Sequence, residues 1–274
     1  MVSHGGGGRR GPLLVLHGGP GYPHDYLLTL EALATDRPVV FYDQLGCGRS
    51  DRPADVSLWR IPRFVRELAR VRETLGLAEL HLFGHSWGAM LAVDYLLDRP
   101  SGIRSVILAS PALSIPRWLA DAEVLRSALP PEVQQVLHHH EKAGTIDHLA
   151  YRVAAKEYYR RYLCRLDHWP ELMDRSREAA SRELYRTMWG PTEFLPIGNL
   201  RDYDRTGRLG EITVPALITC GRHDEATPEA CAFYQRRMPS AELAVFESSS
   251  HMAHLEETDR FIATLRGFLA RMVQ

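Results

Sequence analysis

A single serine stands between two glycines in the stretch FGHSWGA, where Gly84, Ser86 and Gly88 have G-x-S-x-G spacing. An apolar, β-like run precedes the stretch at 79–84, and a helical run follows at 89–100. A serine at such a strand-to-helix turn projects its hydroxyl above a sheet, and small residues two positions away let strand and helix approach closely. A plain glycine turn is the alternative, but both flanking elements that the motif requires are present. We therefore predict that Ser86 is a nucleophile.

A nucleophilic serine needs a base and an acid that orients the base, and behind a turn of this type they follow in the order acid, then histidine. Asp224 comes directly after an apolar run at 214–221, and His251 follows the run at 241–247. Either residue alone would be read as a solvated loop residue. Three matches in order, each after a strand, predict a catalytic triad. His254 is the alternative base, ranked second because it falls three residues further on, inside the expected last helix.

The loop HGGPG at 17–21 follows the first apolar run, at 12–17. Glycine suits a loop whose backbone must face a substrate directly. We predict that the N–H groups of Gly19 and Trp87 form an oxyanion hole beside the serine.

These residues require a sheet that places strand ends on one rim. Short β-rich runs occur at 12–17, 37–43, 79–84, 103–110, 214–221 and 241–247, with helical patterns between them, including 63–76 and 89–100. This alternation predicts an α/β fold with a mostly parallel sheet and helices on both faces. Residues 112–205 read as helices without a strand. We expect a core of 1–111 and 206–274 and an inserted helical cap or lid at 112–205, over the edge where ligands bind.

Composition narrows the function classes. The 274 residues carry a net charge of −1, which gives no electrostatic case for nucleic acid or a membrane surface as a partner. The first residues contain no apolar signal segment, so we expect a cytoplasmic protein. The four cysteines have neither zinc nor redox spacing and are expected to be reduced thiols. The run His138–His140 lacks partners at ligand spacing, so no metal and no cofactor are predicted.

Five segments together resemble the proline iminopeptidase family, in particular its smaller, tricorn-interacting-factor-like type. They are HGGPG at 17–21, YDQLGCGRS at 42–50, GHSWGA at 84–89, GRHDEATP at 221–228 and SSSHMAHLEE at 248–257. The resemblance runs from about residue 12 to the C-terminus. It implies an α/β-hydrolase fold and a serine aminopeptidase that releases N-terminal residues, preferentially proline, from short peptides through an acyl-enzyme.

The resemblance also implies substrate-binding residues. MWGPTEF at 188–194 resembles a lid motif of the smaller enzymes, and by this likeness Glu193 and Glu225 bind the free amine of the substrate. An ammonium group entering a partly dry cleft needs anionic partners, and such anchors would exclude N-blocked peptides. Tyr22, Tyr26 and Phe194, with Trp87, are expected to line an apolar pocket for the first side chain, with a plain core role as the alternative.

One feature departs from the family pattern. Family members carry two strands ahead of the HGGPG strand, whereas only about 11 residues, mostly glycine and arginine, precede it here. Residues 5–10 read as a flexible arm. We expect the strand at 37–43 to be an unprotected edge, covered by a partner chain in a homo-oligomer, by residues upstream, or left bare by a shorter core.

Two alternatives stay open. The same site could act as a hydrolase or acyltransferase on an amino-acid amide, an ester or a small aminoacylated metabolite. The chain could also be a non-catalytic binding protein on a hydrolase fold, although an intact triad speaks against this. A dehalogenase or epoxide hydrolase is disfavoured because those enzymes use an aspartate where this chain has Ser86.

Overall fold

A computed structural model describes residues 2–4 and 11–272 of the chain. Within them, one sheet has the strand order β1-β3-β2-β4-β5-β6-β7. All neighbouring strands run parallel except β1 and β3, which are antiparallel. The predicted α/β fold with a mostly parallel sheet is confirmed. The strands are β1 (Val2–His4), β2 (Leu13–Leu16), β3 (Val39–Phe41), β4 (Leu80–His85), β5 (Ile103–Ala109), β6 (Ala216–Gly221) and β7 (Ala241–Phe246).

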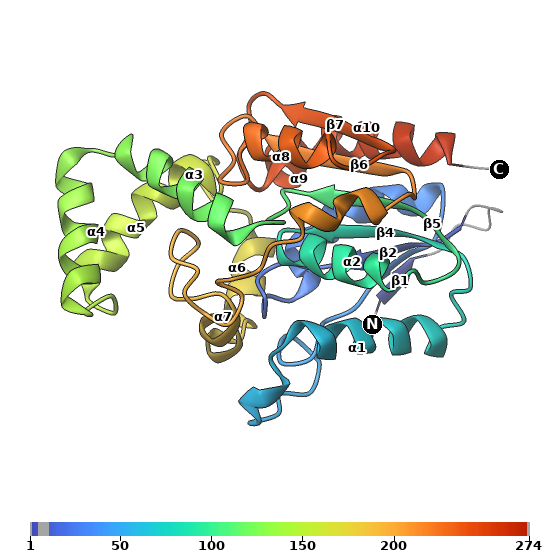
Figure 1. The fold of residues 1–274 in the computed structure, drawn as a ribbon, viewed down its shortest axis with the longest axis horizontal. Coiled ribbons are helices and arrows are strands. Elements are labelled where there is room, and N and C mark those ends of the chain that lie inside the picture. The colour runs from blue at the N-terminus through green and yellow to red at the C-terminus, as the bar shows by residue number, and fades with distance from the viewer. Residues whose placement is uncertain (1, 5–10, 273–274) are drawn as a thin grey trace.

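Helices cover both faces of the sheet (Figure 1). Successive strand side chains point to opposite faces, so Leu14 and Leu16 of β2 pack in one core while Leu13 and Val15 pack in another. The first core is covered by α1 (Ile61–Thr74), α2 (Trp87–Leu97) and α8 (Pro228–Gln235). The second is covered by the 3-10 helix η1 (His24–Thr35), by α9 (Ala253–Glu256) and by α10 (Thr258–Arg271). The two cores, one on each face of the sheet, therefore fix the positions of the strand ends.

The expectation of an unprotected edge at 37–43 is wrong. Residues Val2–His4 form β1 and pair with β3 in antiparallel register, Ser3 opposite Val40. The sequence signal was missed because only three residues form the strand and a glycine-rich run follows them. The reason for expecting a homo-oligomer through the β3 edge is thereby removed. The predicted flexible arm at 5–10 lies outside the described residues.

Helices fill the connection between β5 and β6, as α3 (Ile115–Ser127), α4 (Pro131–Ala143), α5 (Leu149–Tyr162), α6 (Glu171–Glu178) and α7 (Arg182–Met188). Figure 1 shows α3, α4 and α5 extending beyond the sheet and α6 and α7 beside it. A single antiparallel bridge joins Ser114 to Asp204 at the base of this segment. We call residues 112–205 the cap segment; its status as a separate domain stays a prediction.

Short 3-10 helices complete the chain, η2 (Val56–Leu58) before α1 and η3 (Thr206–Glu211) before β6. The four cysteines are buried and unpaired as free thiols. Among the described residues, no helix is both long enough and apolar enough to cross a membrane.

Candidate active site

Ser86 lies at the turn between β4 and α2, with a positive φ of 54°. Such a backbone conformation is strained for any residue with a side chain and is typical of a nucleophile on a sharp turn. The two neighbouring glycines permit it. A Cβ atom on Gly84 would collide with the backbone of Gly88, and one on Gly88 would collide with the Leu16 carbonyl oxygen. The turn therefore depends on the absence of side chains at both positions.

Asp224 and His251 lie side by side although 27 residues separate them. His251 Nδ1 is 2.7 Å from Asp224 Oδ1, and both side chains are buried. The other carboxylate oxygen of Asp224 accepts a 2.6 Å hydrogen bond from the Ser110 hydroxyl, and Oδ1 also accepts from the Ala226 N–H at 2.7 Å. These bonds fix the carboxylate. Nδ1–H of His251 then donates to Asp224, which leaves Nε2 as the proton acceptor.

The electrostatics of the site suit His251 as a base. Burial alone would lower the pKa of His251, but the Asp224 carboxylate, its hydrogen bond and the nearby Glu193 raise that pKa above its usual value. His254, the alternative base, has no such support. Burial, followed by repulsion from His251, lowers the pKa of His254 to about 3, and its Nε2 is buried without a hydrogen-bond partner. The cleft residues include His251 but not His254.

The HGGPG loop is tied to α2 through one glutamine. The Gln44 carboxamide donates to the His17 carbonyl at 3.0 Å and accepts from the Trp87 indole N–H at 2.8 Å. His17 Nε2 accepts the Gln44 backbone N–H at 2.9 Å, so the loop is held from both sides. Gly19 has a φ of 111°, which glycine adopts without strain. Gln44 thus links the two backbone segments that carry the predicted oxyanion donors.

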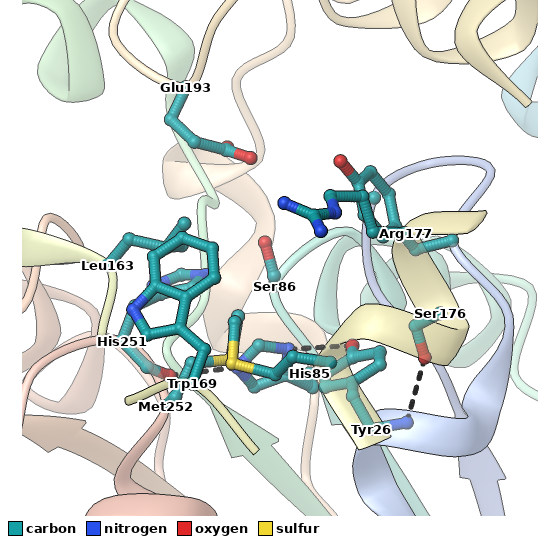
Figure 2. A pocket seen from close by; sticks show the side chains of 13 residues that line it. Tyr26, His85, Ser86, Leu163, Trp169, Ser176, Arg177, Glu193, His251 and Met252 are labelled. Carbon is teal, nitrogen blue, oxygen red and sulfur yellow. Dashed lines mark hydrogen bonds between the residues drawn. The ribbon is translucent and has the colours of Figure 1, made fainter. Parts of the chain in front are cut away.

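A cleft opens above Ser86, with a volume of about 580 Å³ that includes space open to solvent. Its lining comprises Gly19, Tyr22, Tyr26, His85, Ser86, Leu163, Trp169, Met173, Ser176, Arg177, Glu193, His251 and Met252. Figure 2 shows the Ser86 hydroxyl pointing into this space, with His251 to one side and Glu193 above. The structure therefore brings the predicted nucleophile, the predicted base and one predicted amine anchor to a single cavity.

Phe194 is placed differently from the prediction. It is buried in the core of the cap segment, 4.7 Å between ring centroids from Tyr158, and is not among the cleft residues. Glu193 and Phe194 lie in a turn closed by a 3.1 Å hydrogen bond from the Leu195 N–H to the Thr192 carbonyl; the Glu193 side chain faces the cleft, and Phe194 packs in the cap segment. Tyr22 and Tyr26 do line the cleft, whereas the Trp87 side chain is fully buried beneath it.

Within the described residues, Glu225 is a buried carboxyl group without a hydrogen bond, and its Oε1 lies 4.0 Å from His251 Nδ1. It is 2% exposed, and neither carboxylate oxygen makes a hydrogen bond. Burial, then the nearby Glu193 and Asp224 carboxylates, raise the pKa of Glu225 well above its usual value. Burial also raises the pKa of Glu193, against the effect of His251 and of a hydrogen bond from Tyr185. Two desolvated carboxyl groups near Ser86 and His251, one of them without a hydrogen bond, are suited to bind a cation.

Comparison with known proteins gives a consistent assignment. Residues 11–258 match the α/β-hydrolase fold family. A proline iminopeptidase from Heyndrickxia coagulans is 46% identical over 265 residues, which are 96% of this chain and 91% of that protein. This chain belongs to the proline iminopeptidase family. The crystal structure of the Mycobacterium smegmatis proline iminopeptidase superposes with a TM-score of 0.91 at 38% identity, over 99% of this chain and 94% of that one. The crystal structure of VinJ gives 0.95 at 38% identity, with the same coverage.

Sequence reasoning missed the aromatic residues around the carboxyl groups of this family member. Burial, followed by repulsion from Glu193 and Glu225, raises the phenol pKa of Tyr158 and of Tyr159 well above its usual value. For Tyr185, burial and repulsion from Glu193 have the same effect on the pKa. Their hydroxyls therefore stay protonated. In the sequence, the tyrosines at 158–159 and Tyr162 lie one helical turn apart, and this spacing indicates only a helix with an aromatic face.

One group of residues in this iminopeptidase relative has metal-ligand chemistry. His24, Asp25 and Asp43 bring donor atoms within 4.8 Å of one another. Asp43 already accepts hydrogen bonds from His24 Nδ1 at 2.6 Å and from the Arg49 N–H at 2.9 Å. The Arg49 guanidinium also contacts Asp25 at 3.3 Å. The cluster thus fixes the loop after β3 through internal bonds.

Proposed function

We propose that this chain is a serine aminopeptidase that releases N-terminal proline from short peptides. One observation carries the proposal: Glu193 lines the cleft with Ser86 and His251, and the buried Glu225, which makes no hydrogen bond within the described residues, lies 4.0 Å from His251 Nδ1. The free amine of a peptide supplies the missing positive charge. A peptide bound in this way places its first carbonyl at the serine, so cleavage removes one residue at a time.

In the proposed reaction, Ser86 Oγ attacks the carbonyl carbon of the first residue while His251 Nε2 takes the hydroxyl proton. Asp224 holds the imidazolium through Nδ1–H. The backbone N–H groups of Gly19 and Trp87 stabilise the oxyanion, and the positive end of the α2 dipole adds to this. His251 then returns the proton to the leaving amine. Water, activated by the same histidine, hydrolyses the acyl-enzyme and frees the amino acid.

The test is hydrolysis of prolyl-, alanyl- and leucyl-aminocoumarin amides, each with a free and an N-acetylated terminus. We expect cleavage of the free-amine forms, fastest for proline, and none of the acetylated forms. Ser86→Ala should keep the fold and reduce turnover by a factor of roughly 10⁴ or more, because removing a triad nucleophile leaves only binding and the oxyanion hole. Equal cleavage of blocked and free substrates would exclude the amine anchors, and near-wild-type turnover by Ser86→Ala would exclude this nucleophile.

A further inference from the structure

The cleft carries a positive charge that the proposed reaction does not use. Figure 2 shows Arg177 and Glu193 pointing into the cleft from different sides, with the Ser86 hydroxyl below and between them. Both side chains line the cavity. A substrate with a cationic amine and an anionic carboxylate would match this separation of charge, with its reactive carbonyl over the serine.

The backbone that carries Arg177 is fixed to the core. The hydroxyl of the preceding residue, Ser176, accepts a 2.9 Å hydrogen bond from the Tyr26 N–H, next to the oxyanion loop. Beyond the end of α6, the Ala179 carbonyl accepts from the Gly48 N–H at 3.0 Å. The arginine therefore projects from a wall of the cleft whose position relative to Ser86 is set by bonds on both sides of it.

The guanidinium itself is available for a ligand. The structure gives it one ion pair, to Asp174 at 2.8 Å, between side chains that are 61% and 46% exposed. Exposed pairs of this kind contribute little, so a substrate carboxylate can replace Asp174 at small cost. The charge also acts inside the cleft. Burial and Glu193 raise the pKa of the cleft residue Tyr22 to about 12, against the lowering effect of Arg177.

We propose that Arg177 binds the C-terminal carboxylate of the substrate, so that dipeptides with a free C-terminus are preferred. The inference rests on the proposed function, since it needs the amine held at Glu193 and Glu225. A residue spans at most about 3.6 Å of chain, so the carboxylate of a dipeptide falls within one residue of the scissile nitrogen, on the side away from the amine. Arginine can bind a carboxylate through two parallel hydrogen bonds, which orients the leaving residue as well as attracting it.

The alternative role for Arg177 is electrostatic. It could offset the negative charge of the cleft without touching the substrate. In that case its loss would change the turnover of every free-amine substrate by the same factor, whatever the leaving group. The two roles thus differ in one measurable quantity, the ratio of kcat/KM for a free acid to kcat/KM for its amide.

The experiment measures kcat/KM for prolylglycine, for prolylglycine amide and for prolyl-aminocoumarin, with wild type, Arg177→Gln, Arg177→Lys and Arg175→Gln. Arg175 is the matched control because it lies on the same helix, is similarly exposed and pairs with Glu171, yet does not line the cleft. We expect wild type to prefer the free acid over the amide by up to about five-fold, because the ion pair is formed with an exposed guanidinium. Arg177→Gln should abolish that preference and leave the other two substrates within about two-fold of wild type. Arg177→Lys should restore part of it, and Arg175→Gln should change nothing.

Two results would overturn the proposal: no preference of the wild type for the free acid, or an equal loss of all three activities in Arg177→Gln. Failure of the proposed function looks different, because wild type would then leave prolyl-aminocoumarin intact. Cleavage of prolyl-aminocoumarin without any preference for the free acid would refute the role of Arg177 alone.

Discussion

Replacing Glu225 by glutamine separates substrate binding from fold stability. The carboxyl is 2% exposed and lacks a hydrogen-bond partner, and burial beside Glu193 and Asp224 raises its pKa. A substrate ammonium would supply a charge-assisted hydrogen bond, worth about 1.5–3 kcal/mol. At about 1.4 kcal/mol per factor of ten, Glu225→Gln should lower kcat/KM for prolyl-aminocoumarin by roughly 10- to 150-fold.

The same substitution should stabilise the empty protein. A carboxyl whose pKa is higher in the folded than in the unfolded state keeps its full contribution to stability below the unfolded pKa, and loses it as the pH rises through the folded pKa. Glutamine has no proton to lose. The melting temperature of Glu225→Gln should therefore exceed that of wild type, by a margin that grows between about pH 5 and the raised folded pKa of Glu225.

The assay combines steady-state kinetics with thermal unfolding at pH 5, 6, 7 and 8. A small aryl ester without an amine reports on the triad alone and should react at a similar rate in both proteins. Glu183→Gln, an exposed change in the first turn of α7, is the control for removing a carboxylate from the cap segment. An equal loss of ester and amide hydrolysis would refute the reasoning, as would a melting temperature below wild type at pH 8.

Three further predictions follow from the site. Glu193→Gln removes a charge that raises the pKa of His251. The acidic limb of the pH–rate profile for an ester without an amine should therefore move to lower pH. An unchanged acidic limb would show that Glu193 does not influence the pKa of His251. Gln44→Ala removes the link between the oxyanion loop and α2, and should lower kcat about 10- to 100-fold with little change in KM, since the donors act on the transition state; a selective rise in KM would point to substrate contact instead. Gly88→Ala would force a Cβ against the Leu16 carbonyl and should destabilise the fold by about 1–3 kcal/mol or more, measured by urea unfolding; a neutral effect would mean that the turn can relax.

The sequence was most informative where chemistry depends on local geometry. The G-x-S-x-G turn could be predicted because its glycines and flanking elements are contiguous in the chain. Asp224 and His251 followed from the rule that parallel strands end on one rim. Contacts between segments that are distant in the sequence could not be predicted. Gln44 was part of a recognised stretch, but its bonds to His17 and Trp87 depend on how three loops meet.

Two errors have a common physical cause. Phe194 was expected in the substrate pocket as one of several aromatic residues, and the sequence does not show which way an aromatic side chain points; the structure favours the alternative, a core role. Strand β1 was overlooked because three residues carry too little periodicity to stand out, although pairing with β3 supplies the hydrogen bonds that such a short strand cannot provide alone. In both cases the deciding partner lies elsewhere in the chain.

The buried carboxyl groups link the stability of the empty protein to the expected substrate selectivity. Burial raises the pKa of both Glu193 and Glu225, and the Glu193 carboxylate raises the pKa of Glu225 further. The empty site therefore favours a bound proton, and on the proposed function a substrate ammonium would displace that proton to form its ion pair. An N-blocked peptide brings no positive charge and leaves the carboxyl groups unpartnered beneath it. On the proposed function, discrimination against blocked and internal peptide bonds would come from the same desolvation that destabilises the empty protein. A variant that removes a buried carboxyl group should therefore be more stable and should lose the discrimination.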